Sequence, residues 1–84
     1  MYIYKRCKNK YSLVDYVDSK DEITIENRII KLLRKDKETK DIYNIKSKFT
    51  GLFTVYYFKG NYAFIVSEYL LDENGVVKSR EMIF

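Results

Sequence analysis

Histidine, proline and tryptophan are absent from this 84-residue sequence, and cysteine occurs once. Without histidine the chain lacks the commonest general base and the commonest metal ligand. Cys7 alone supplies too few ligands for zinc, so we expect no metal and no other cofactor. The glycines Gly51, Gly60 and Gly75 lie far apart and form no phosphate-binding loop. The sequence therefore predicts a protein without catalytic residues, not an enzyme.

These scarcities also bear on where the protein works. A single cysteine cannot form an internal disulfide, which favours a reducing compartment: the cytoplasm, or the host-cell cytoplasm if the gene is viral. No stretch reaches the roughly 20 apolar residues that span a bilayer, so we expect no membrane partner. The first ten residues place charge after a short apolar run, the reverse of a secretory signal. Residue types with A- and T-rich codons make up half of the chain, which suggests an AT-rich genome: a low-GC bacterium, its phages or an archaeal virus. We expect a phage or mobile-element gene.

A chain of this length predicts a single domain, residues 1–84. Residues 2–7 are typical of a short strand, and residues 11–17 fit a helix better because their apolar positions do not alternate cleanly. A C-terminal three-stranded meander is predicted by β-branched and aromatic runs at 52–58, 62–71 and 76–84. The run at 62–71 is apolar on both faces and belongs at the sheet centre. The expected fold class is α+β, with one or two helices packed on an antiparallel sheet.

The clearest helix follows an acidic stretch at residues 18–22. Ser19 and Glu22 have capping-box spacing, and Asp21 and Thr24 are alternative N-caps. At helical spacing one side is apolar and is expected to face the core: Ile25, Ile29, Leu32 and Leu33. The helix is expected to fade within residues 37–40, after which a loop brings three more side chains to the core: Ile42, Ile45 and Phe49.

Basic side chains are concentrated in two stretches of the chain. Residues 1–10 and 28–48 together carry nine more basic than acidic side chains, while the remainder carries five more acidic ones. The expected binding surface is a basic helix face extended by the first strand: Arg28, Lys31, Arg34, Lys35, Lys5 and Lys8. Such a surface binds phosphates in a salt-dependent, sequence-independent way. The alternative is that these side chains only solvate the outer face of an amphipathic helix.

Tyrosine is abundant, with nine residues, and several lie on the predicted sheet. The candidate aromatic surface consists of Tyr56, Tyr57, Tyr62 and Tyr69. Aromatic side chains beside basic ones stack unpaired bases in many nucleic-acid-binding proteins, and they also anchor protein interfaces. The alternative is that they are ordinary core and half-buried sheet residues. The sequence signature of the RNA-recognition sheet is absent.

The stretches IENRIIKLLRKD (25–36) and KFTGLFTVYYFKGNYAFIVSEYLLDENG (48–75) resemble the second helix and the hairpin region of RelE/ParE-like toxins, including the YoeB branch. The resemblance implies the order strand, two helices and three-stranded meander, and it implies RNA cleavage. Residues near the implied active strand are Arg80, Glu81 and Phe84. The hairpin position that the family fills with arginine reads Tyr62-Ala63 here, so the family's cleavage residues are not matched.

Three functions remain open from the sequence. The favoured one is a small non-enzymatic binding protein that binds nucleic acid or inhibits a nucleic-acid-handling protein, for example as a counter-defence inhibitor. The second is a RelE-like ribonuclease with an atypical active site. The third is a structural subunit that forms a homodimer or larger homo-oligomer through an apolar sheet face.

Overall fold

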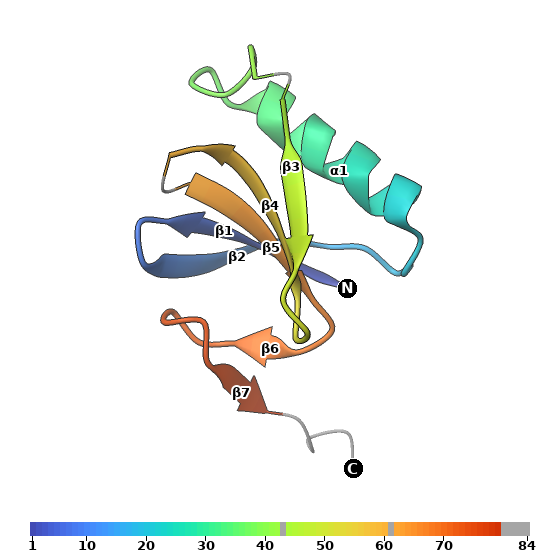
Figure 1. Cartoon of the computed structure of the whole chain (residues 1–84), viewed down its shortest axis with the longest axis vertical. Coiled ribbons are helices and arrows are strands. Elements are labelled where there is room, and N and C mark those ends of the chain that lie inside the picture. Colours follow the sequence, from blue (N-terminus) through green and yellow to red (C-terminus); the bar gives the residue numbers. More distant parts are fainter. Residues whose placement is uncertain (43, 61, 80–84) are drawn as a thin grey trace.

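The computed structural model describes residues 1–42, 44–60 and 62–79. Within these ranges the chain forms one helix, a five-stranded sheet and a separate two-stranded sheet, so the α+β fold is confirmed (Figure 1). The elements are β1 (Tyr2–Cys7), β2 (Lys10–Tyr16), α1 (Glu22–Lys35), β3 (Lys46–Phe49), β4 (Thr54–Lys59), β5 (Tyr62–Ser67), β6 (Leu70–Leu71) and β7 (Val77–Ser79).

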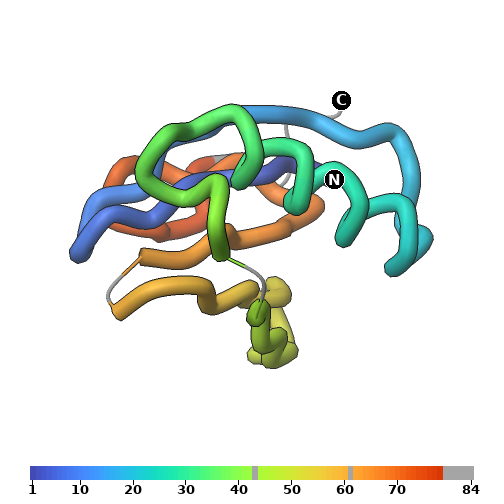
Figure 2. Tube along the Cα trace, turned by 90° about the horizontal axis from the view of Figure 1, so that it is seen from above, coloured from blue at the N-terminus to red at the C-terminus, as the bar shows by residue number. Residues whose placement is uncertain are grey.

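The large sheet has the strand order β2-β1-β5-β4-β3, and every neighbouring pair is antiparallel. The central strand is β5, and its residues from Ala63 to Ser67 are buried, as its apolar pattern predicted. Figure 1 shows the sheet from its β3 side, with α1 above it and the β6–β7 hairpin below it. In the view from above in Figure 2, the strands lie side by side in this order, with β3 at one margin of the sheet. The sheet is therefore the middle of three layers.

Helix α1 begins at the N-cap Asp21, one of the alternatives that the sequence offered. The Asp21 carboxylate accepts hydrogen bonds from the Thr24 backbone N–H at 3.0 Å and from the Thr24 hydroxyl at 2.8 Å. The apolar side of the helix then packs on the sheet through Ile25, Ile29 and Leu33, which are almost completely buried. The prediction of this inward face is confirmed.

The prediction of a helix at residues 11–17 is wrong, because residues 10–16 form β2. Ile3 pairs with Asp15 and Tyr4 pairs with Leu13, which leaves Val14 as an extra residue in a β-bulge. A bulge shifts the alternation of inward and outward side chains by one position. The interrupted alternation in the sequence was therefore the mark of a bulged strand.

The predicted meander is only partly correct. Strands β4 and β5 are neighbours in the large sheet, but the expected strand at 62–71 breaks after Ser67, whose hydroxyl accepts a hydrogen bond from the Tyr69 backbone N–H at 3.0 Å. The chain then crosses to the other face, where β6 pairs with β7. Residues 80–84 of the expected last strand lie outside the described residues.

The segment after α1 also differs from the expected loop. Ile42 and Ile45 pack against the core as expected, but Phe49 is 70 % exposed and does not close it. Residues 46–49 form the edge strand β3, whose side chains are all exposed. Exposed KSKF carries no apolar alternation, so its strand conformation depends on pairing with β4.

The β6–β7 hairpin is held against the sheet by polar contacts as well as apolar ones. The buried Tyr4 hydroxyl accepts a hydrogen bond from the Leu71 backbone N–H at 2.8 Å and donates one to the Tyr69 carbonyl at 3.1 Å. Burial raises the pKa of this phenol. Gly75, at φ +81°, brings the hairpin loop against the Tyr11 ring. Leu71 completes a second apolar cluster on this face.

Candidate anion-binding groove

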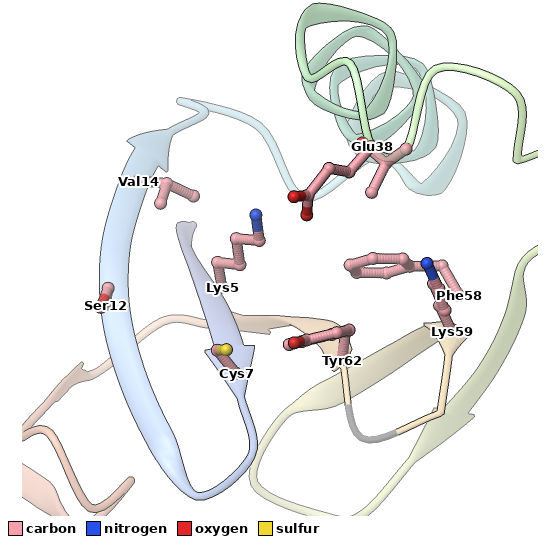
Figure 3. Close-up of a pocket in the computed structure, with 9 residues that line it drawn as sticks. Lys5, Cys7, Ser12, Val14, Glu38, Phe58, Lys59 and Tyr62 are labelled. Atoms are coloured by element: carbon pink, nitrogen blue, oxygen red, sulfur yellow. The ribbon is translucent and has the colours of Figure 1, made fainter.

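Three segments that are distant in the sequence meet at the end of the sheet that carries the β1–β2 and β4–β5 turns. They enclose a cavity of about 220 Å³, shown in Figure 3. Strands β1 and β2, the loop after α1 and the β4–β5 hairpin supply its walls: Lys5, Cys7, Ser12, Val14, Glu38, Thr39, Phe58, Lys59 and Tyr62. We call this cavity the turn-end groove.

The groove continues towards the helix as a second hollow of about 140 Å³. The two share the walls formed by Lys5, Val14, Thr39 and Phe58. The inner hollow is lined further by apolar Leu32 and Phe64 and by the carboxylate of Asp36. The groove thus has an apolar floor and a polar rim, which is the usual composition of a ligand site.

The wall on the helix side is fixed by hydrogen bonds at the C-terminal end of α1. The buried Thr39 hydroxyl donates to the Leu33 carbonyl at 2.8 Å, which satisfies a carbonyl in the last turn of the helix. Arg34 Nη1 donates to the carbonyls of Lys40 and Ile42, both at 2.9 Å, and so holds the loop over the helix end. Arg34 therefore stabilises the conformation of the loop after α1.

Charge on the rim is only partly neutralised. Lys5 Nζ lies 3.3 Å from Asp36 Oδ2. The pKa of Asp36 is lowered, first by the Glu38 backbone N–H that it accepts and then by Lys5. Lys59 is exposed on the opposite wall and makes no ion pair within the described part of the chain. An anion entering the groove would therefore meet one engaged lysine, one available lysine and the carboxylate of Glu38, which points into the groove in Figure 3.

Aromatic rings lie between these two lysines. Phe58 and Tyr62 are stacked, with centroids 6.5 Å apart and ring planes at 17°. The Phe58 ring also lies against the ring of Phe64, with the two centroids 5.1 Å apart. The Tyr62 hydroxyl points towards the Cys7 thiol in Figure 3, and hydrogen bonding to Cys7 raises the pKa of the phenol. The stacked pair gives the groove a flat apolar surface.

The residues of the predicted basic face have different partners in the structure. Arg28 Nη1 lies 2.8 Å from Asp15 Oδ2 on β2, and this contact lowers the pKa of Asp15. Arg34 holds the loop after α1, whereas Lys31 and Lys35 are exposed on the helix. Of the two residues expected to extend the face, Lys5 lines the groove and Lys8 lies exposed in the β1–β2 turn at φ 62°.

The four predicted tyrosines are also separated. Tyr56 is buried beneath α1, where burial raises the pKa of its phenol, and Tyr62 lies in the turn-end groove on the same face. Tyr57 lies on the opposite face, with the Arg6 guanidinium 5.7 Å from its ring centroid. Tyr69 lies in the connection between β5 and β6, where its carbonyl accepts from Tyr4. The candidate residues Arg80, Glu81 and Phe84 lie outside the described residues.

Several residues of the groove could not be singled out from the sequence. Lys59 lies between two predicted strands, and Ser12 belongs to the segment predicted to be a helix. Glu38 and Thr39 reach the groove because Arg34 and Thr39 fix the loop after α1. The position of Lys59 in the connection between two strands was only a weak indication of a binding site. It became informative because the structure places the β1–β2 turn beside this connection.

Comparisons with family models, with curated proteins and with solved structures found no match. In the ranges that the structure covers, no group of three or more His, Cys, Asp or Glu side chains could hold a metal ion. The single described helix, α1, lacks both the length and the apolar character needed to cross a bilayer. The candidate site is therefore defined by its own geometry.

Proposed function

We propose that this protein binds single-stranded nucleic acid at the turn-end groove and acts without catalysis. The observation that carries the proposal is the stacked pair Phe58 and Tyr62, which lies in one groove between Lys5 and Lys59. A flat apolar ring surface accepts an unpaired base, and neighbouring lysines attract the phosphates on either side of it. Bases within a duplex are already stacked and cannot reach the groove.

The distribution of charge along the molecule supports this site. Helix α1 carries Glu22 in its first turn, and Arg34 and Lys35 in its last turn, the end at which the loop that lines the groove begins. Lys8 in the adjoining turn adds a charge that no described acidic residue pairs with. Basic side chains near a helix C-terminus are also favoured by the helix dipole, so this distribution alone would not identify a ligand. The basic side chains lie near a groove that also carries aromatic rings, and this combination favours a polyanion that carries bases, which is a nucleic acid.

The proposal includes a cytoplasmic location and a phage or mobile-element origin. The free, exposed Cys7 thiol supports a reducing compartment. The residue types with A- and T-rich codons support the origin.

The test is fluorescence anisotropy with a labelled oligothymidylate of about 15 nucleotides, compared with a duplex of the same length. Binding to the single strand should be tighter and should weaken between about 50 and 200 mM salt. Lys8→Glu with Lys59→Glu should lower the slope of log affinity against log salt by about 2 in magnitude. Tyr62→Ala should weaken binding by about tenfold or more, whereas Tyr62→Phe, which keeps the ring, should bind normally.

The matched control is Lys31→Glu with Lys35→Glu, which makes the same change in net charge on the exposed face of α1. Circular dichroism verifies that each variant is folded. If the groove variant and the helix variant lose the same amount of affinity for the single strand, the groove is not the binding site, and the basic helix face becomes the favoured binding surface. Equal affinity for single strand and duplex would reject the role of the aromatic pair.

A further inference from the structure

A second surface of the protein lies on β3, at the edge of the large sheet. β3 pairs with β4 along one side, and no described element pairs with its other side. Figure 2 shows the strand at the margin of the fold, away from the β1–β2 turn. All four of its residues are exposed. An open strand edge presents backbone N–H and C=O groups that can pair with another chain.

The two faces of β3 differ in chemistry. Lys46 pairs in register with Tyr57 and Lys48 with Val55, which places both lysines on the face that the β6–β7 hairpin shares. No acidic side chain of the described residues forms an ion pair with either lysine. This side of the edge is therefore a short row of uncompensated positive charge.

The alternate residues of β3 belong to the helix face. Ser47 borders a hollow of about 200 Å³ between β3 and α1, and Phe49 lies 70 % exposed at the end of the strand. The rest of this hollow is lined by four isoleucines and Tyr56, with the charged side chains of Glu26 and Arg34 among them. An added strand would therefore place alternate side chains beside lysines and beside apolar groups.

We propose that the β3 edge binds an extended acidic segment of another protein as an additional strand. Carboxylates at alternate positions of that segment reach Lys46 and Lys48, and apolar side chains between them contact Phe49 and the hollow beside α1. Backbone pairing supplies affinity, and the alternation selects the sequence. This surface is separate from the turn-end groove.

Charge and hydrogen bonding decide between this occupant and two others. A second copy of the protein pairing through β3 would bring lysines against lysines, and like charges on adjacent strands are destabilising. A nucleic acid strand would satisfy the charge of Lys46 and Lys48 but has no peptide backbone to pair with the open edge. An acidic peptide satisfies both requirements.

The test is an NMR titration of the isotope-labelled protein with a short synthetic peptide in which glutamate and valine alternate. Amide shifts should centre on residues 46–49, at peptide concentrations up to about 1 mM. N-methylation of alternate peptide residues should abolish binding, because it removes the backbone donors. Lys46→Glu with Lys48→Glu should weaken binding about tenfold, whereas Lys31→Glu with Lys35→Glu should leave it unchanged.

Three results would overturn the proposal. The first is no binding of the alternating peptide over this concentration range. The second is equal binding of the N-methylated peptide, since charge alone would then explain the interaction. The third is an oligothymidylate that shifts the same β3 amides as strongly as the peptide does, which would make β3 part of a nucleic-acid surface.

Discussion

The two layers that cover the sheet are attached in different ways. Helix α1 is held by apolar side chains that repeat at helical spacing, Ile25, Ile29 and Leu33, against the cluster around Ile3 and Phe64. The β6–β7 hairpin has a smaller apolar contact and depends on the Tyr4 hydroxyl and on the close approach of Gly75 to Tyr11. Apolar packing tolerates many side chains of similar volume, whereas a hydrogen bond and a close backbone approach each depend on one residue.

The largest effect is expected on the helix side. Ile29→Ala should lower the free energy of unfolding by about 3 kcal/mol, because it leaves a cavity beneath a side chain that is 1 % exposed. Urea denaturation measures the change. Ile23→Ala, at a helix position that is 68 % exposed, is the control and should change stability by less than about 0.5 kcal/mol. Similar values for the two variants would mean that α1 is not attached through this apolar side.

The next largest effect is expected in the hairpin loop. Gly75→Ala should cost about 2 kcal/mol, because the residue has φ +81° and a Cβ there would lie 2.6 Å from Tyr11 Cζ. Gly51→Ala, at φ +96° with no atom within 4 Å of its Cβ, is the matched control and should cost about 1 kcal/mol. Thermal unfolding of both variants isolates the contribution of the Tyr11 contact. Equal costs would show that this contact does not hold the hairpin.

A smaller effect should follow from loss of the Tyr4 hydroxyl. Tyr4→Phe should cost about 1.5 kcal/mol, because the buried Leu71 N–H loses its acceptor. Hydrogen exchange at the Leu71 amide should accelerate, while exchange within α1 stays unchanged. Tyr16→Phe, at a tyrosine that is 51 % exposed, should have no measurable effect. Unchanged exchange at Leu71 would show that the Tyr4 hydroxyl does not hold the hairpin in place.

The smallest effect is expected at the ion pair that links α1 to β2. Asp15→Asn should cost less than about 1 kcal/mol near neutral pH, because both partners are partly exposed. The Arg28 guanidinium lowers the pKa of Asp15 below its ordinary value of 3.8. The carboxylate therefore stabilises the fold above pH 3.8, and this contribution is lost as the pH falls through the lowered pKa. The difference in stability between wild type and variant, measured against pH, should shrink over that acidic range; a difference that grows there would contradict the assignment.

At the candidate site, the sequence indicated which residue types are present, whereas contacts between distant segments decided how these residues are grouped. Lys5 and Tyr62 were candidate residues, but they were assigned to two separate surfaces, and the structure places them in one groove. Arg28 and Arg34 were expected to face a ligand, and they instead contact Asp15 and the loop carbonyls. A basic residue and its partner are far apart in the chain, so composition and spacing could not show which charges are compensated.

The amino-acid sequence by itself determined the apolar side of α1, the central place of β5 and the α+β class, because each depends on the periodicity of apolar residues. It left the N-cap of α1 open between Ser19, Asp21 and Thr24, and the structure selects Asp21. Only the tertiary structure decided that residues 46–49 form a strand, that the bulged β2 is not a helix and that the chain crosses the sheet after Ser67. Those features depend on pairing between distant segments. The Tyr4–Leu71 contact joins residues 67 positions apart, and no local pattern encodes such a contact.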